Sequence, residues 1–304
     1  MNAKPLALLG PAQIRQLAEK LGVSPTKKLG QNFVHDAGTV RRIAAQAGVG
    51  QSDVVLEVGP GLGSLTLALL EAGSQVVAVE IDERLAQALP STVATVAPEE
   101  AARLGVINQD ALTLEGPALH ALPQHLDGLP GSPTARPTAL VANLPYNVAV
   151  PVLLTVLAQF PSVKSGVVMV QKEVADRLIA SPGSRTYGAP TVKLAWYGTS
   201  KSAGTVGRKV FWPEPNVDSA LVAFERGRSP RGGENLREAT FGLIDAAFGQ
   251  RRKMIRSSLK SQFESEEAMA GALAAASLSG TERPEELTID QFTALAESVI
   301  GSGS

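Results

Sequence analysis

Short apolar runs alternate with amphipathic segments along the first two thirds of the chain. Five runs have the length and continuous hydrophobicity of buried strands, at residues 54–58, 75–80, 105–109, 139–142 and 166–171. Apolar residues at helical spacing occupy three of the intervals, at residues 65–71, 83–89 and 151–159. This alternation predicts an α/β fold in which helices cover both faces of a parallel sheet.

The remaining segments predict how the chain is divided. Helices are expected at residues 11–22, 38–47, 171–178 and 190–197, a last strand at 220–224, and surface insertions at 97–104 and 123–137. Residues 226–233 have the composition of a linker, and residues 234–300 are helical by pattern. We therefore expect an N-terminal arm at 1–26, an α/β domain at 27–228 and a small all-α domain at 229–304.

The strand at 54–58 ends in a glycine-rich turn, Gly59-Pro60-Gly61-Leu62-Gly63. Glycine adopts positive φ readily and lets a ligand approach the backbone, and parallel sheets bind ligands at the carboxyl ends of their strands. Glu80, which ends the next strand, can accept hydrogen bonds from both hydroxyls of a ribose. The pattern predicts a nucleoside pocket, although a tight turn without a ligand fits it too.

The spacing of these glycines separates two classes of cofactor. Dinucleotide sites favour G-x-G-x-x-G, whereas this turn is G-P-G-L-G, and Pro60 removes an amide that a phosphate would use. Glu57, just before the turn, suits a cationic ligand without phosphate. The combination resembles motif I of the S-adenosylmethionine-dependent methyltransferases, and a dinucleotide oxidoreductase becomes a distant alternative.

A second candidate site, Asn143-Leu144-Pro145-Tyr146, follows the strand at 139–142. Because this tetrapeptide also lies at the carboxyl end of a strand, we expect it to face the same crevice as the glycine turn. The Asn143 side chain and the Leu144 carbonyl can hold an amino group on a rigid turn, and Tyr146 can stack on the ring that carries it. Without a methyl-donor site nearby, a simple turn would explain the pattern as well.

Asp110 and the Lys27-Lys28 pair can each be interpreted in two ways. Asp110 ends the strand at 105–109, where it can accept a hydrogen bond from an adenine amine or cap a turn. Lys27 and Lys28 precede the first core helix, either in a solvated linker or in a lid that covers the cofactor and contacts phosphates.

Composition excludes several classes of protein. The 304 residues include no cysteine, so disulfides and thiolate metal sites are excluded, and the three histidines form no ligand-spaced cluster. No segment has the roughly 20 apolar residues of a membrane span, and no signal peptide is evident. We expect a cytoplasmic protein without a metal ion or a membrane partner.

Charge is unevenly distributed although the net charge is only −1. Residues 201–260 carry 12 basic and 6 acidic side chains, whereas residues 261–304 carry 1 basic and 8 acidic ones. The basic block is densest at Arg251, Arg252, Lys253 and Arg256, near a predicted helix start, where cations oppose the helix dipole. Contacts with RNA phosphates would explain them, and a solvated helix face is the alternative.

Together these segments resemble the small-subunit ribosomal RNA adenine dimethyltransferases, a family related to the erythromycin-resistance rRNA methyltransferases. The resemblance covers nearly everything from Lys27 to Leu259. It rests on KKLGQNFVHD, LEVGPGLGSLT, VEID, QDAL, NLPYNVAVPVL, QKEVADRL, SRTYGAPTV, FWPEPNVDSALV and FGQRRKMIRSSL. The last of these motifs and the helical C-terminal region favour the housekeeping branch. The family pattern departs at Trp212, where a smaller or different residue is expected.

The resemblance implies a Rossmann-like class I methyltransferase with a seven-stranded, mostly parallel sheet. It implies S-adenosylmethionine as cofactor and two methyl transfers to N6 of each of two adjacent adenosines, in a hairpin loop near the 3′ end of 16S rRNA. The implied partner is this rRNA or an immature 30S particle, and we expect a monomer. The cofactor-binding residues assigned on this basis are Asn32, Val34, Gly59, Gly61, Glu80, Ile81, Asp110, Ala111 and Asn143.

The catalytic residues assigned are Asn143, Leu144, Pro145, Tyr146 and Phe211, the last as a second stacking wall beside Tyr146. The RNA-binding residues assigned are Lys27, Lys28, Arg251, Arg252, Lys253 and Arg256. Two rival functions stay open. A DNA adenine N6 methyltransferase would share the amine-binding motif but typically has Pro where Leu144 stands. An rRNA-binding assembly factor whose methylation is incidental would share every feature.

Overall fold

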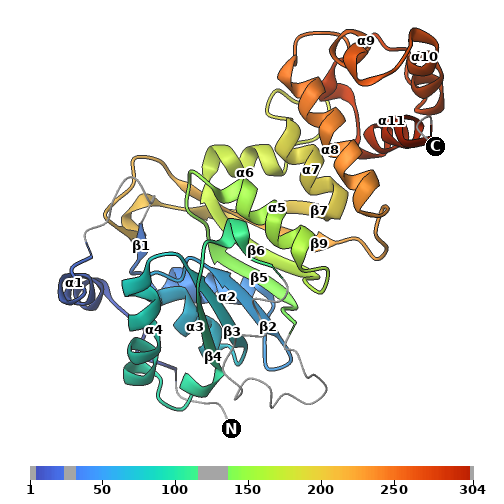
Figure 1. Ribbon diagram of the computed structural model, residues 1–304. Coiled ribbons are helices and arrows are strands. Elements are labelled where there is room, and N and C mark those ends of the chain that lie inside the picture. Colours follow the sequence, from blue (N-terminus) through green and yellow to red (C-terminus); the bar gives the residue numbers. More distant parts are fainter. Residues whose placement is uncertain (1–4, 24–31, 116–135, 302–304) are drawn as a thin grey trace. The chain divides into compact units, whose positions relative to one another are not determined.

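A computed structural model describes residues 5–23, 32–115 and 136–301, and its main feature is a seven-stranded sheet. The strand order is β4-β3-β2-β5-β6-β9-β7 and can be followed across Figure 1. The strands are β2 (Val54–Val58), β3 (Gln75–Glu80), β4 (Leu104–Asn108), β5 (Ala139–Asn143), β6 (Ser165–Gln171), β7 (Gly198–Val206) and β9 (Ser219–Arg226). A second sheet consists of β1 (Phe33–Val34) and β8 (Phe211–Trp212).

Neighbouring strands from β4 to β6 are parallel, and β9 is antiparallel to β6. The helices are α1 (Pro11–Lys20), α2 (Ala37–Ala47), α3 (Ser64–Glu71), α4 (Glu83–Val96), α5 (Ala149–Gln159), α6 (Lys172–Leu178), α7 (Ala189–Tyr197), α8 (Glu234–Gly249), α9 (Ile255–Ser258), α10 (Glu266–Ala275) and α11 (Ile289–Gly301). Both the mostly parallel sheet and the helical C-terminal region were expected from the sequence. None of the helices in the described ranges is long and apolar enough to cross a membrane.

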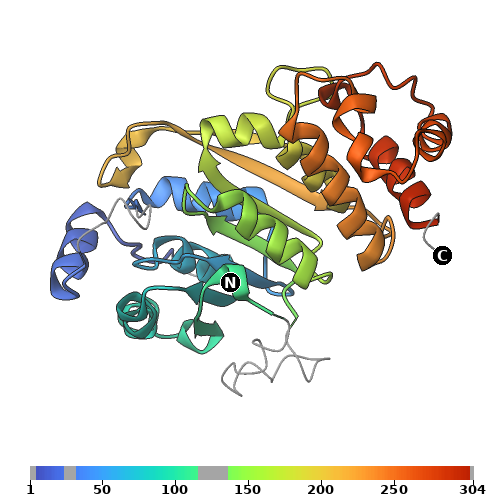
Figure 2. The same cartoon turned by 45° about the horizontal axis from the view of Figure 1, so that its top comes forward.

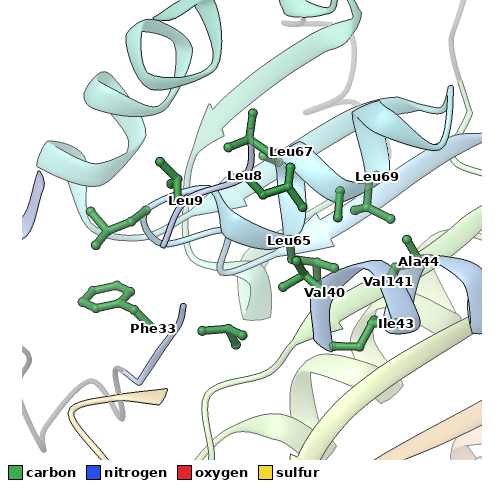
Figure 3. Packing of buried hydrophobic residues seen from close by; sticks show 14 of the residues in the cluster. Leu8, Leu9, Phe33, Val40, Ile43, Ala44, Leu65, Leu67, Leu69 and Val141 are labelled. Carbon is green, nitrogen blue, oxygen red and sulfur yellow. The ribbon is translucent and has the colours of Figure 1, made fainter. Parts of the chain in front are cut away.

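Side chains on the two faces of the sheet belong to different apolar layers. Val55, Val141 and Met169 belong to a cluster that also takes in the buried faces of α1, α2, α3 and α4. Figure 3 shows Val40, Ile43 and Ala44 of α2 grouped with Val141 of β5. The residues next to them in the strands, such as Leu56 and Leu140, are equally buried but lie outside that cluster. The alternation places both faces of the sheet in a core.

Local chemistry fixes where α2 begins and ends. The Asp36 carboxylate accepts a hydrogen bond from the Thr39 amide at 2.7 Å, which satisfies one of the free donors of the first turn. The helix ends at Gly48, whose φ of 66° belongs to the left-handed region that glycine favours. Because Asp36 caps α2, only two residues lie between the end of β1 and the start of the helix.

Two boundaries differ from the sequence expectation. We expected a helix to end near Leu89, but α4 continues through Pro90 to Val96. Proline costs the helix one hydrogen bond, and the buried side chains of Leu85, Leu89 and Val93 keep the helix on the sheet. The insertion expected at 97–104 includes Leu104, which is the buried first residue of β4.

The chain forms two compact units, Met1–Ala175 with Lys201–Glu225, and Asp176–Ser200 with Arg226–Ser304. In the second unit, orange to red in Figure 2 for its C-terminal helices, Phe248 of α8 lies 6.3 Å from both Tyr187 and Phe292, measured between ring centroids. The Tyr187 hydroxyl donates to the Leu287 carbonyl at 2.9 Å. Residues 176–200 therefore pack with the C-terminal helices. The domain bounds at 26/27 and 228/229 stay predictions.

Candidate functional site

The glycine turn lies between β2 and α3 and has an unusual backbone. Gly59, Gly61 and Gly63 have φ values of 71°, 57° and 92°, all in the region that disfavours side chains. The Gly63 amide donates to the Pro60 carbonyl at 3.0 Å, which closes the turn. Alternate glycines therefore let the chain leave a buried strand and enter a helix within a few residues.

The middle glycine is also required by its neighbours. A Cβ atom added to Gly61 would lie 2.9 Å from two atoms of the Phe33 ring, closer than carbon atoms approach in proteins. The Gly61 amide donates to Oε2 of Glu80 at 3.1 Å. The turn is thus held between the ring of β1 and the carboxylate that ends β3.

Glu80 is a buried carboxylate fixed from two sides. Besides the Gly61 amide, the Asp82 amide donates to its Oε1 at 3.0 Å. Burial raises the pKa of Glu80, and the backbone hydrogen bonds oppose that rise. The side chain is therefore pre-oriented before any ligand arrives.

Glu57, the acidic residue before the turn, is enclosed more completely, with 1% of its surface exposed. The Thr66 hydroxyl donates to its Oε2 at 2.7 Å. Burial raises the pKa of Glu57 to about 8, an effect that nearby Glu80 increases and Thr66 reduces. Glu57, Glu80 and Asp110 line the same cavity. At neutral pH the Glu57 carboxyl is mostly protonated.

The second corner of the site follows β5, where the backbone leaves the sheet at Asn143. The Leu144 amide donates to the Met169 carbonyl of β6 at 3.1 Å, and the Val148 amide donates to the Pro145 carbonyl at 3.2 Å. The Asn143 side chain donates through Nδ2 to the Asn32 carbonyl at 3.2 Å. The turn is therefore held at both ends, and the amide of Asn143 has a defined direction.

The two corners lie side by side, as the sequence predicts. A Cβ added to Gly59 would lie 3.8 Å from the Asn143 carbonyl oxygen and 3.9 Å from Cδ of Pro145. One cavity is lined by residues of both turns. The expectation that both strand ends face the same crevice is confirmed.

Tyr146 lies at the rim of this cavity and is held by β9. Its hydroxyl lies 2.7 Å from the Ser219 hydroxyl, within hydrogen-bond distance. Partial burial raises the pKa of Tyr146, and the hydrogen bond with Ser219 opposes the rise. The ring therefore stays neutral and fixed in orientation over the physiological pH range.

The far end of the cavity combines a carboxylate with apolar side chains. Oδ1 of Asp110 accepts from the Leu112 amide at 2.9 Å, so the capping role considered for it is real. Asp110 also lines the cavity, next to Ala111. Ile81 and Leu112 line it too, and they are 55% and 38% exposed although both are large and apolar. An apolar ring bound in the cavity would cover this exposed apolar surface.

Most predicted site residues come together in this cavity. Its lining includes every predicted cofactor residue and the predicted acceptor turn, namely Asn32, Val34, Gly59, Gly61, Glu80, Ile81, Asp110, Ala111, Asn143, Leu144, Pro145 and Tyr146. Two further residues of the lining were not predicted from the sequence. Ser64 lines the cavity, and its buried hydroxyl has no hydrogen-bond partner within the described residues. Leu112 lines it too, and the apolar residue after a strand end in Asp110-Ala111-Leu112 could have indicated it.

Other predicted residues lie elsewhere. Phe211 is 3% exposed, packs in the core cluster and is not among the residues that line the cavity. Lys27 and Lys28 lie outside the described residues. The remaining RNA-binding candidates lie in the second unit. Arg251, Arg252 and Lys253 lie between α8 and α9, and Arg256 lies in α9; Arg252, Lys253 and Arg256 are exposed. Arg251 differs from them, because it donates to the Arg185 carbonyl at 2.8 Å and lies 3.6 Å from the Glu285 carboxylate.

The chain is similar in sequence to known proteins over nearly its whole length. Residues 23–300 match the model of the family described as ribosomal RNA adenine dimethylase. A ribosomal RNA small subunit methyltransferase A from Leifsonia xyli subsp. xyli is 58% identical over 291 residues, which cover 96% of this chain and 98% of that protein. The protein of the same name from Streptomyces avermitilis is 55% identical over 294 residues, with coverage of 97% and 95%.

Two solved structures resemble the chain over most of its length. The 23S rRNA methyltransferase ErmE has a TM-score of 0.61 at 26% identity, with 88% of this chain and 100% of that chain covered. A dimethyladenosine transferase from Plasmodium falciparum has a TM-score of 0.71 at 22% identity, with 89% and 98% covered. The second likeness concerns the fold, which is that of the class I methyltransferases.

Proposed function

The chain belongs to the ribosomal RNA adenine dimethylase family, and we propose from this that it methylates small-subunit rRNA. The reaction is the transfer of methyl groups from S-adenosylmethionine to N6 of two adjacent adenosines, two to each, in a hairpin loop near the 3′ end of 16S rRNA. We propose that the enzyme acts during assembly of the subunit in the cytoplasm, on the rRNA of an immature 30S particle, and as a monomer.

One observation carries the proposal: the glycine turn and the Asn143 turn line one cavity. Gly59 of the first corner lies against Asn143 and Pro145 of the second. Methyl transfer requires donor carbon and acceptor nitrogen to meet in line at roughly 3 Å. Corners this close allow that approach without a large movement of the backbone.

The residues present fit the cofactor. Glu80 would accept hydrogen bonds from the ribose hydroxyls, and Asp110 from the adenine amine. The exposed side chains of Ile81 and Leu112 would pack against the adenine ring. The buried hydroxyl of Ser64 offers an unused hydrogen-bonding group. When bound, S-adenosylmethionine supplies a methyl group activated by a sulfonium charge. The Glu80 carboxylate in the same cavity suits that positive charge.

The acceptor turn makes a poor nucleophile more reactive. The exocyclic amine of adenine has its lone pair delocalised into the ring. Oδ1 of Asn143 and the Leu144 carbonyl can accept its two hydrogens, which favours a pyramidal nitrogen whose lone pair points at the methyl group. As the C–N bond forms, the C–S bond breaks and its electron pair stays on sulfur, and the nitrogen then releases a proton to water. The chain needs no general base for this step.

The target base must leave its stack to reach the turn. A loop adenine does so at low cost, and the Tyr146 ring, held by Ser219, is proposed to stack on it. A role for Phe211 in that wall would act through the backbone of β8, because its ring is buried. The exposed cations Arg252, Lys253 and Arg256 are proposed to contact phosphates of the rRNA.

A panel of substrates tests the proposal. The protein is incubated with labelled S-adenosylmethionine and with under-methylated 30S particles, 16S rRNA, 23S rRNA or adenine-containing duplex DNA. We expect label in the small-subunit substrates and none in the other two. Label in duplex DNA would favour a DNA adenine methyltransferase. Label in 23S rRNA would contradict the proposal that small-subunit rRNA is the substrate.

A further inference from the structure

A two-stranded ribbon outside the main sheet joins the residues before α2 to the residues before β9. In this ribbon β1 pairs with β8 in antiparallel fashion, with Phe33 opposite Trp212. Their rings stack with centroids 6.3 Å apart and planes inclined by 23°. The His35 amide donates to the Val210 carbonyl at 2.9 Å, which extends the pairing. Trp212 thus fixes the place of β1 through a ring contact as well as through the backbone.

The ribbon contacts both corners of the active site. The Phe33 ring lies against Gly61 so closely that a Cβ there would lie 2.9 Å away. The residue before it, Asn32, accepts the hydrogen bond from Nδ2 of Asn143 at 3.2 Å. Two consecutive residues therefore contact the two turns: the Phe33 side chain of β1 contacts the cofactor turn, and the carbonyl of Asn32, directly before β1, contacts the acceptor turn.

The direction of the Asn143 amide decides whether it can act. An asparagine side chain has a donating NH2 end and an accepting oxygen end. The Asn32 carbonyl accepts from the NH2 end, which leaves Oδ1 for the target amine. A reversed amide would present NH2 to the amine of adenine, so two donors would meet and the acceptor would be lost.

We propose that Trp212 is a positioning residue for methyl transfer. By stacking on Phe33 it holds the Asn32 carbonyl in place, and this carbonyl selects the end of the Asn143 amide that faces the target nitrogen. The inference rests on the proposed function of Asn143. Trp212 itself does not line the cavity, so its effect is transmitted through β1.

The kinetic test compares two substitutions of the same side chain. Trp212→Leu keeps an apolar side chain but removes the ring, whereas Trp212→Phe keeps a ring that can stack. We expect Trp212→Leu to lower kcat on under-methylated 30S particles at least tenfold, since misplacing a reacting group by about 1 Å can cost about 100-fold. KM for S-adenosylmethionine should change less than threefold, because Glu80 still holds the nucleoside. Trp212→Phe should retain kcat within threefold.

A spectroscopic test reports on the amide without any substrate. In protein labelled with 15N-asparagine, the side-chain NH2 signals of Asn143 are identified by their absence from Asn143→Ala. We expect these signals to shift in Trp212→Leu and to keep their positions in Trp212→Phe. If Trp212→Leu does not show a cooperative melting transition, Trp212→Met, which also removes the ring but keeps a long apolar side chain, replaces it in both tests.

The outcomes separate the two proposals. Unchanged Asn143 signals, or kcat within twofold of the unsubstituted protein, would overturn the role of Trp212. A loss of kcat that Trp212→Phe does not restore would do the same. If the unsubstituted protein fails to methylate rRNA, the proposed function fails, while the NH2 signals still report whether Trp212 orients Asn143.

Discussion

Replacing Glu57 by Gln is expected to stabilise the protein at alkaline pH and not at acidic pH. The carboxyl is enclosed, and burial raises its pKa from 4.5 to about 8. Because the folded state holds this proton more tightly than the unfolded chain, the contribution of Glu57 to stability is full below pH 4.5. It is lost as the pH rises towards about 8. Glutamine has nearly the same shape, can accept from the Thr66 hydroxyl and does not titrate.

The size of the effect follows from that interval. The rise from 4.5 to about 8 spans about 3.5 pKa units, each worth about 1.4 kcal/mol, so the ceiling is about 5 kcal/mol. Between pH 5 and pH 8, only part of this interval is crossed. We expect the free energy of unfolding of Glu57→Gln, relative to the unsubstituted protein, to increase by about 3 kcal/mol over that range.

Urea unfolding at pH 5 and pH 8 measures this difference, with the slope of each transition checked for equality. Glu83→Gln, which removes a carboxylate from an exposed position, is the control for the loss of one negative charge. If Glu57→Gln differs from the unsubstituted protein by the same amount at both pH values, the argument that burial controls this carboxyl is wrong.

Three further predictions concern the site and the RNA surface. Asn143→Ala should abolish turnover and leave the Kd for S-adenosylmethionine within tenfold by calorimetry, because the acceptor is removed but the nucleoside contacts stay; full activity would refute its role. Gly61→Ala should weaken cofactor binding at least tenfold, because a Cβ would meet the Phe33 ring and the backbone φ of 57° disfavours a side chain. The control is Gly242→Ala on α8, where an added Cβ meets nothing within 4 Å. This control should leave cofactor binding unchanged. Equal affinities in the two glycine variants would contradict the account of the turn. Arg252→Glu with Lys253→Glu should weaken rRNA binding and reduce the slope of log K against log salt by about 1 for each phosphate that is no longer neutralised; an unchanged slope in filter binding would mean that these cations are only solvated.

The strands and helices that carry the site could be predicted because their patterns are local. Continuous apolar runs such as 139–142 identify strands buried on both faces, and glycines at a strand end identify a turn that needs positive φ. Strand β7 was missed because its sequence, GTSKSAGTV, is polar, and most of its residues are exposed or half-buried at the edge of the sheet. The spacing of apolar residues in a sequence reflects which side chains are buried, and few side chains of β7 are buried.

Contacts between distant residues could not be predicted in the same way. Tyr146 depends on Ser219, and Phe33 depends on Trp212, although neither pair is marked by spacing or periodicity. Phe211 was expected to face the substrate, but the pairing of β8 with β1 buries its ring. Chemistry-bearing residues at strand ends could therefore be identified from the sequence, whereas the residues that orient them required the fold.

The most direct test of the central claim is mass spectrometry of nucleosides from under-methylated 30S particles after incubation with the protein and S-adenosylmethionine labelled in its methyl group. We predict N6,N6-dimethyladenosine carrying two labelled methyl groups, located to two adjacent positions in a loop near the 3′ end of 16S rRNA, and none with Asn143→Ala. Label on a ring nitrogen, on ribose or on another base would contradict the proposal that the Asn143 turn holds the exocyclic amine of adenine.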